Sequence, residues 1–118
     1  MELKWNVDKF GIEIKTDDEH FVISAKPSMV MSWEDSMRFY KDDTTWKLPT
    51  IKQTKLVAKN IDEINNIIEE NNGYPLFGFL WTCETTGKDA WNVNLYEGYS
   101  GYGRRYLNYF VRAVSALD

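Results

Sequence analysis

The side chains between Tyr96 and Tyr109 have the composition of a recognition surface. Tyrosines recur there between the glycines at positions 98, 101 and 103, and two arginines follow. Tyrosine offers a rigid amphipathic surface at low entropic cost, and arginine forms bidentate hydrogen bonds or stacks on flat groups. We therefore expect this segment to bind a protein surface or a glycan through Tyr96, Tyr99, Tyr102, Arg104 and Arg105.

The same residues also allow a purely structural interpretation. The tyrosines could pack against the edge of a sheet, and the arginines could pair with the acidic segment at residues 60–90. A glycine-rich loop is expected to lie at the surface, where binding residues are concentrated, and this favours the binding interpretation. Both alternatives stay open at the level of the sequence.

The residue types needed for nucleophilic catalysis are sparse. His20 is the only histidine and Cys83 the only cysteine, so any Ser-His-Asp or Cys-His arrangement depends on them. His20 follows three acidic residues, which predicts a solvated turn. Cys83 precedes Glu84 rather than a basic residue, which predicts a buried, inert thiol. We expect no catalytic residue, although an enzyme using Glu84 and Asp89 remains a less favoured alternative.

Metal and cofactor motifs are also missing from the sequence. The Glu-Pro-Asn, Gln-Pro-Asp and Trp-Asn-Asp motifs of calcium-dependent lectins do not occur, and Trp91-Asn92-Val93-Asn94 only faintly echoes the last of them. The acidic residues at 17–19, 42–43 and 69–70 are typical of solvated turns and a helix face. We expect neither a metal nor a cofactor.

Composition excludes several partner classes. The 118 residues carry a net charge of −4 with a pI near 5.0, which makes nucleic acid a poor partner. No apolar run approaches the roughly 20 residues of a membrane span, so no membrane insertion is expected.

The first ten residues show no secretory signal, which makes the cytoplasm the default location, with a cell surface or particle as alternatives. The length predicts one domain over 1–118; oligomeric state stays open.

The elements that must position these residues follow from the hydrophobic spacing. Alternation over 10–25 predicts a hairpin. Ser32 and Asp35 resemble a helix N-cap before the stripe of Trp33, Met37 and Tyr40. Thr50 and Gln53 form a capping box that begins a second helix, and isoleucines over 61–68 predict a third that stops at 72–73.

The second half of the chain changes to the period of strands. Apolar runs predict strands at 76–83, 91–95 and 109–114, with a loop over 97–105. Strands, helices and strands in this order predict an α+β fold with a mainly antiparallel sheet. Trp33, Trp81 and Trp91 occupy periodic apolar positions and are expected in the core, with Trp46 and Leu48 pinning the loop before Thr50.

Three islands of sequence together resemble the Lcl C-terminal domain family of bacterial collagen-like adhesins. They are Ser32-Trp33 through Trp46-Lys47-Leu48-Pro49-Thr50, Leu80-Trp81-Thr82-Cys83-Glu84-Thr85, and Ala90-Trp91-Asn92-Val93 through Phe110-Val111-Arg112-Ala113-Val114. The resemblance covers about residues 29–115, after the N-terminal hairpin. It implies a C-type-lectin-like fold, related to formylglycine-generating and sulfatase-modifying proteins, with a small twisted antiparallel sheet flanked by two to three helices. Lys47, Cys83 and the extra helix at 61–75 depart from the family pattern.

These observations favour a non-catalytic, lectin-like recognition domain that binds a protein surface or a glycan without calcium. The alternative is a structural or assembly subunit of a surface appendage or phage-like particle, in which the segment at 96–106 contacts another subunit. Formylglycine-type thiol oxidation needs redox-active cysteines, whereas this chain has only Cys83.

Overall fold

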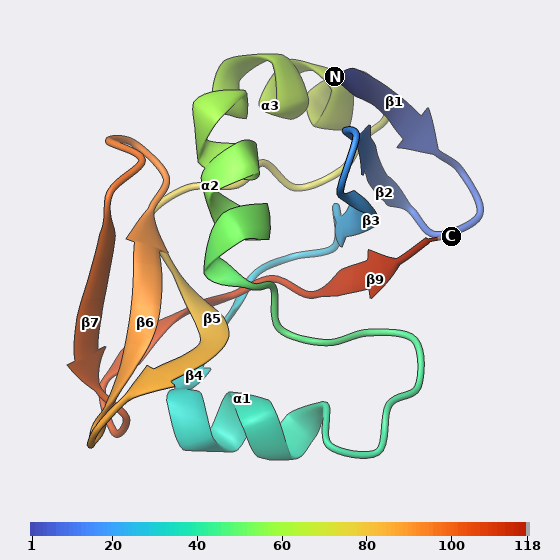
Figure 1. Cartoon of the computed structure of the whole chain (residues 1–118). Coiled ribbons are helices and arrows are strands. Elements are labelled where there is room, and N and C mark those ends of the chain that lie inside the picture. Colours follow the sequence, from blue (N-terminus) through green and yellow to red (C-terminus); the bar gives the residue numbers. More distant parts are fainter. Residues whose placement is uncertain (118) are drawn as a thin grey trace.

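The N-terminal residues form a four-stranded antiparallel sheet (Figure 1). Its strands are β1 (Glu2–Asn6), β2 (Gly11–Lys15), β3 (His20–Ser24) and β9 (Val114–Ala116), in the order β1-β2-β3-β9. The predicted hairpin is confirmed as β2 and β3, whose register pairs Ile12 with Ile23 and Ile14 with Phe21, all fully buried. β1 was not predicted, although Leu3 and Trp5 alternate with the exposed charged residues Glu2 and Lys4. This computed structural model describes residues 1–117.

The three predicted helices are present as α1 (Trp33–Phe39), α2 (Ile51–Lys59) and α3 (Ile61–Glu70). The Ser32 hydroxyl accepts a hydrogen bond from the Asp35 amide at 3.1 Å. Thr50 and Gln53 complete a reciprocal capping box, with both hydrogen bonds at 3.0 Å. The N-caps inferred from the sequence are therefore confirmed, because a capping box depends on residues only three positions apart.

A second, five-stranded sheet contains β4 (Met29–Ser32), β5 (Phe79–Thr86), β6 (Asp89–Asn94), β7 (Ser100–Arg104) and β8 (Asn108–Val111), in the order β4-β8-β5-β6-β7. The strands pair mainly antiparallel, as expected, but the described chain has two sheets where one was expected. β5 and β8 moreover run parallel where Leu80 meets Phe110. The mixed α and β content is confirmed, whereas the C-type-lectin-like assignment stays a prediction.

Two strand predictions need correction. The run at 109–114 is two strands, because the chain leaves the second sheet after Val111 and enters the first at Val114. The predicted loop at 97–105 contains β7, which pairs with β6 through Trp91–Tyr102 and its neighbours. Gly103 of this strand serves packing, because a Cβ there would lie 3.1 Å from the Tyr109 ring. Composition alone suggested a loop, but the close approach of Tyr109 explains the glycine.

The apolar interior has two parts. α2 packs on β5 and β6, and α3 packs on β1 and β2, so the helices fill the space between the sheets (Figure 1). A second cluster surrounds Trp81, which is fully buried, and includes Val111 and Leu48. Trp33, Trp46 and Trp91 are only half-buried, so their predicted core positions are corrected to the margins of the core.

Arg112 lies at the point where the chain passes between the sheets. Its side chain is 2% exposed and uses every N–H of the guanidinium. The acceptors are the Ser28 hydroxyl at 3.1 and 2.8 Å and the carbonyls of Ser24, Tyr74 and Pro75 at 2.9, 2.8 and 3.1 Å. No ion pair in the described part of the chain involves Arg112. Burial lowers its pKa to about 10, so the group stays charged at neutral pH.

Arg112→Met is expected to reduce the free energy of unfolding by about 3 kcal/mol, because it leaves buried carbonyls without donors. Arg112→Lys should recover only part of this loss, since an ammonium has three donors instead of five. Urea unfolding followed by tryptophan fluorescence measures both. Arg38→Met is the control, because the Arg38 side chain is 71% exposed and should change stability little. An Arg112→Met protein as stable as the parent would contradict the structural role.

Candidate functional site

β7 forms an outer edge of the five-stranded sheet. It pairs with β6 from Val93–Ser100 to Asp89–Arg104, and no strand among residues 1–117 lies on its other side. The outward-facing N–H and C=O groups of an edge strand can pair with another chain. The predicted binding segment therefore has backbone hydrogen-bonding capacity as well as side chains.

The three predicted tyrosines and the neighbouring Tyr106 are all exposed along this edge. Tyr96 and Tyr99 lie in the β6–β7 turn, Tyr102 lies within β7, and Tyr106 follows the strand, with 86%, 71%, 64% and 75% of their surfaces exposed. The turn is held by Asn94, whose side chain accepts from the Tyr96 amide at 2.9 Å and whose carbonyl accepts from Gly98 at 2.7 Å. These tyrosines are not packed away, although their binding role stays a prediction.

The two predicted arginines make different contacts. The Arg104 Nε lies 3.5 Å from the Asp89 Oδ1, so the alternative of pairing with the acidic segment holds for this residue. Arg105 donates to the Gly87 carbonyl at 2.7 Å and places its guanidinium 4.9 Å from the Trp33 ring centre. Its carbonyl also accepts from the Trp33 amide at 3.0 Å. Arg105 thus fastens the end of β7 to α1, while Arg104 remains largely exposed.

A shallow depression of about 350 Å³ opens at this end of β7. Lys88, Arg104 and Arg105 supply positive charge, against Glu34, and Tyr106 supplies an aromatic wall. The depression can attract a carboxylate, because its three cations outnumber Glu34 and the Asp89 carboxylate that pairs with Arg104. Sequence reasoning missed Lys88, which comes next to Arg104 only through the antiparallel pairing of β6 and β7.

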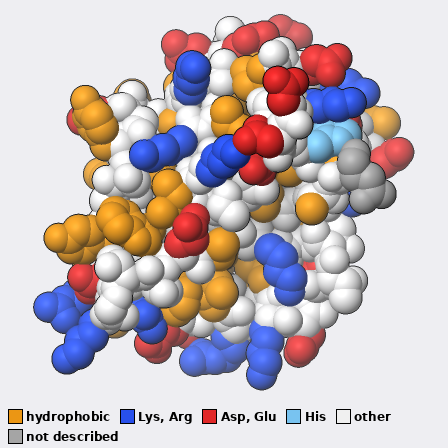
Figure 2. All heavy atoms as spheres, viewed as in Figure 1, with side chains coloured by type: hydrophobic (Ala, Val, Ile, Leu, Met, Phe, Trp, Pro, Cys, Tyr) orange, Lys and Arg blue, Asp and Glu red, His pale blue; other side chains and the backbone are white. Residues whose placement is uncertain are grey.

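Further aromatic side chains lie on this part of the molecule, among them Trp91, which the sequence predicted to be in the core. Trp91 is half-buried, and its ring meets that of Tyr102 edge-on at 5.4 Å. Phe77 and Phe79, before and at the start of β5, are 52% and 44% exposed. Figure 2 shows hydrophobic side chains gathered over the β6–β7 edge, with Lys and Arg side chains below them. The alternation around Trp91 predicted a strand correctly, but it did not show that the Trp91 face of this strand is partly exposed.

The residues weighed for catalysis have structural contacts. His20 begins β3 rather than lying in a solvated turn, with its Nε2 2.9 Å from Glu13 Oε2, which corrects the prediction. Cys83 is half-buried, and burial raises the pKa of its thiol. Glu84 is exposed and accepts a 2.6 Å hydrogen bond from the Ile51 amide at the start of α2. Within residues 1–117, no three His, Cys, Asp or Glu side chains gather in a way that could hold a metal ion.

Comparisons with known proteins add no family. A scan against protein-family models gives no match, and a search of curated proteins gives none. The resemblance to the Lcl C-terminal domain family therefore stays a prediction. The described helices are all too short or too polar to cross a membrane.

Glu13 is expected to make stability depend on pH. The hydrogen bond from His20, followed by contacts with Asn6 and Lys4, lowers the pKa of this carboxyl below its usual value. The contribution is therefore complete above the unfolded-state pKa and is lost as pH falls through the folded-state pKa. Urea unfolding at pH 7 and in steps below pH 5 should show a smaller acid loss for Glu13→Gln than for the parent. Equal acid losses in both proteins would contradict this assignment.

Proposed function

We propose that this domain is a non-catalytic recognition module that binds an extended segment of a partner protein along β7. The observation that supports it is an edge strand with free backbone groups that carries an exposed tyrosine and is flanked by three more. Adding a strand to a sheet edge supplies affinity through main-chain hydrogen bonds and specificity through alternate side chains. The binding needs no calcium, cofactor or nucleic acid.

The two faces of β7 offer different contacts to an added strand. On one face, Tyr102 and Trp91 form an aromatic step. On the other face, Gly101 and Gly103 lack side chains, and Tyr109 lies close to Gly103. Because Tyr109 already covers Gly103, the larger side chains of a partner are expected on the Tyr102 face of the strand, beside the aromatic step. At the end of the strand, Lys88 and Arg104 favour a partner carboxylate.

Two alternative partners of the β7 surface are a second copy of the chain and a glycan. A second copy of the chain could pair through β7, which is the assembly-subunit alternative, and it would produce a symmetric dimer. A glycan could stack on the tyrosine faces, as expected for a lectin-like domain. An enzyme using Glu84 and Asp89 is less favoured, because Glu84 is exposed and bonded to the Ile51 amide.

Tyr102→Ala is expected to weaken binding of peptides selected from a random phage-displayed library by tenfold or more, as for an aromatic hot spot. Its unfolding free energy should change by less than about 1 kcal/mol, the contribution of one aromatic pair. Arg104→Glu should select against acidic peptides. Fluorescence polarisation with synthetic peptides measures the affinities. Tyr74→Ala is the matched control, because Tyr74 is 53% exposed but follows α3, outside β6 and β7.

Selected peptides that bind Tyr102→Ala as well as the parent would contradict the proposal. Light scattering that shows a stable dimer dispersed by Tyr102→Ala would favour assembly. Saturable glycan binding, with no peptide selected above background, would favour the lectin-like alternative.

A further inference from the structure

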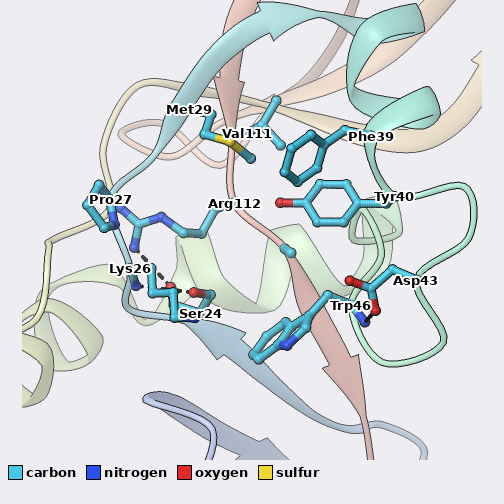
Figure 3. Close-up of a pocket in the computed structure, with 11 residues that line it drawn as sticks. Ser24, Lys26, Pro27, Met29, Phe39, Tyr40, Asp43, Trp46, Val111 and Arg112 are labelled. Carbon is cyan, nitrogen blue, oxygen red and sulfur yellow. Dashed lines mark hydrogen bonds between the residues drawn. The ribbon is translucent and has the colours of Figure 1, made fainter.

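A second feature, separate from β7, is a cavity where the two sheets meet. It encloses about 290 Å³ between the β3–β4 connection, the end of α1 and the β8–β9 connection (Figure 3). None of its lining residues belongs to β6 or β7. The volume is near the lower limit of small-molecule sites, which run from about 300 to 1,000 Å³. It therefore suits a ligand with about one ring.

The hydroxyl of Tyr40 is directed into this cavity without a protein partner. Tyr40 is 9% exposed, and Figure 3 shows its oxygen pointing from α1 toward Arg112. Tyr40 forms hydrogen bonds in the described chain through its backbone, as in the bond from Lys47 Nζ to its carbonyl at 2.8 Å, and its hydroxyl forms none. The hydroxyl makes no hydrogen bond with the described chain and is open to the cavity, so it can donate one to a polar ligand group there.

The charge around the cavity indicates the sign of that partner. Arg112 contributes a buried positive charge, and its N–H groups are all directed at protein acceptors, so it acts through its field. Lys26 stands at the mouth and, like Arg112, has no ion pair in the described residues. Asp43 lies across from them, with its Oδ1 held by the Thr45 and Trp46 amides at 2.8 Å each. These charges favour a ligand with one negative group, bound on the Arg112 side. A second negative group would lie near Asp43 and be repelled.

The rest of the wall is apolar or aromatic. Met29, Phe39 and Val111 form one side, and the half-buried Trp46 forms another. Such walls hold a hydrocarbon body, while a few polar groups fix its orientation.

We propose that this cavity binds a small monocarboxylate with an aromatic or branched apolar body. The carboxylate accepts hydrogen bonds from the Tyr40 hydroxyl and the Lys26 ammonium, and the Arg112 charge stabilises it. The apolar body lies between Met29, Phe39 and Val111. Binding is non-covalent and goes beyond the recognition proposed for β7.

The test is a titration with 3-phenylpropionate and its neutral analogue 3-phenylpropionamide, followed by two-dimensional NMR of the ¹⁵N-labelled protein. The carboxylate should give saturable shifts at the amides of Met29, Tyr40 and Val111, with an affinity about tenfold or more above that of the amide. Tyr40→Phe should weaken carboxylate binding about tenfold, the effect of one hydrogen bond to a charged group. It should leave stability unchanged, because the hydroxyl has no partner to lose.

Lys26→Gln provides a second variant at an exposed position, and it should weaken carboxylate binding severalfold and reduce its salt dependence. Tyr102→Phe is the control, with unchanged binding. Equal affinities for acid and amide, no saturable shift up to 10 mM carboxylate (about −2.7 kcal/mol of binding free energy), or unchanged binding in Tyr40→Phe would each overturn the proposal. Because Tyr40 and Tyr102 are in separate sites, failure here leaves the test of β7 unaffected.

Discussion

The buried Arg112 guanidinium joins three passages of the chain between the two sheets. β3 continues into β4 through Ser24 and Ser28, α3 continues into β5 through Tyr74 and Pro75, and β8 continues into β9 through Arg112 itself. Connections of this kind bury backbone carbonyls that no sheet can satisfy. A planar group with five donors satisfies several of them at once, whereas an apolar side chain would satisfy none.

This junction also determines where the candidate sites lie. β8 ends at Val111, next to Arg112, and is the second strand of the five-stranded sheet, so β5, β6 and β7 extend away from it to a free edge. The tyrosines of the β6–β7 hairpin therefore lie far along the sheet from the junction, at the surface. The small-molecule cavity lies at the junction, since Arg112 and its neighbours Val111 and Ala113 form part of its wall. The arrangement of the strands around Arg112 thus separates the β7 edge, which suits a protein strand, from the cavity, which suits a small anion.

Several local features could be read from the sequence because they depend on neighbours within a few positions. The β2–β3 hairpin follows from alternation, and the N-termini of α1 and α2 follow from Ser32 and from the Thr50–Gln53 box. For Tyr96, Tyr99, Tyr102 and Tyr106 the sequence left exposure and packing as alternatives, with the glycines favouring exposure, and the structure shows them exposed. Yet the glycines proved to belong in part to a strand, where Gly103 makes room for Tyr109.

By itself, the sequence determined the mixed α and β content and the helix starts, since each is encoded by short-range spacing and side-chain type, whereas it left the exposure of the tyrosine-rich segment open. The tertiary structure alone decided that one apparent strand at 109–114 serves two sheets, that Trp91 lies at a margin, and that Tyr40, Lys26 and Arg112 surround one cavity. These outcomes depend on contacts between residues far apart in the sequence, such as Ser24 and Arg112, which are 88 positions apart. No local pattern specifies such contacts, because they arise only when separate elements pack together.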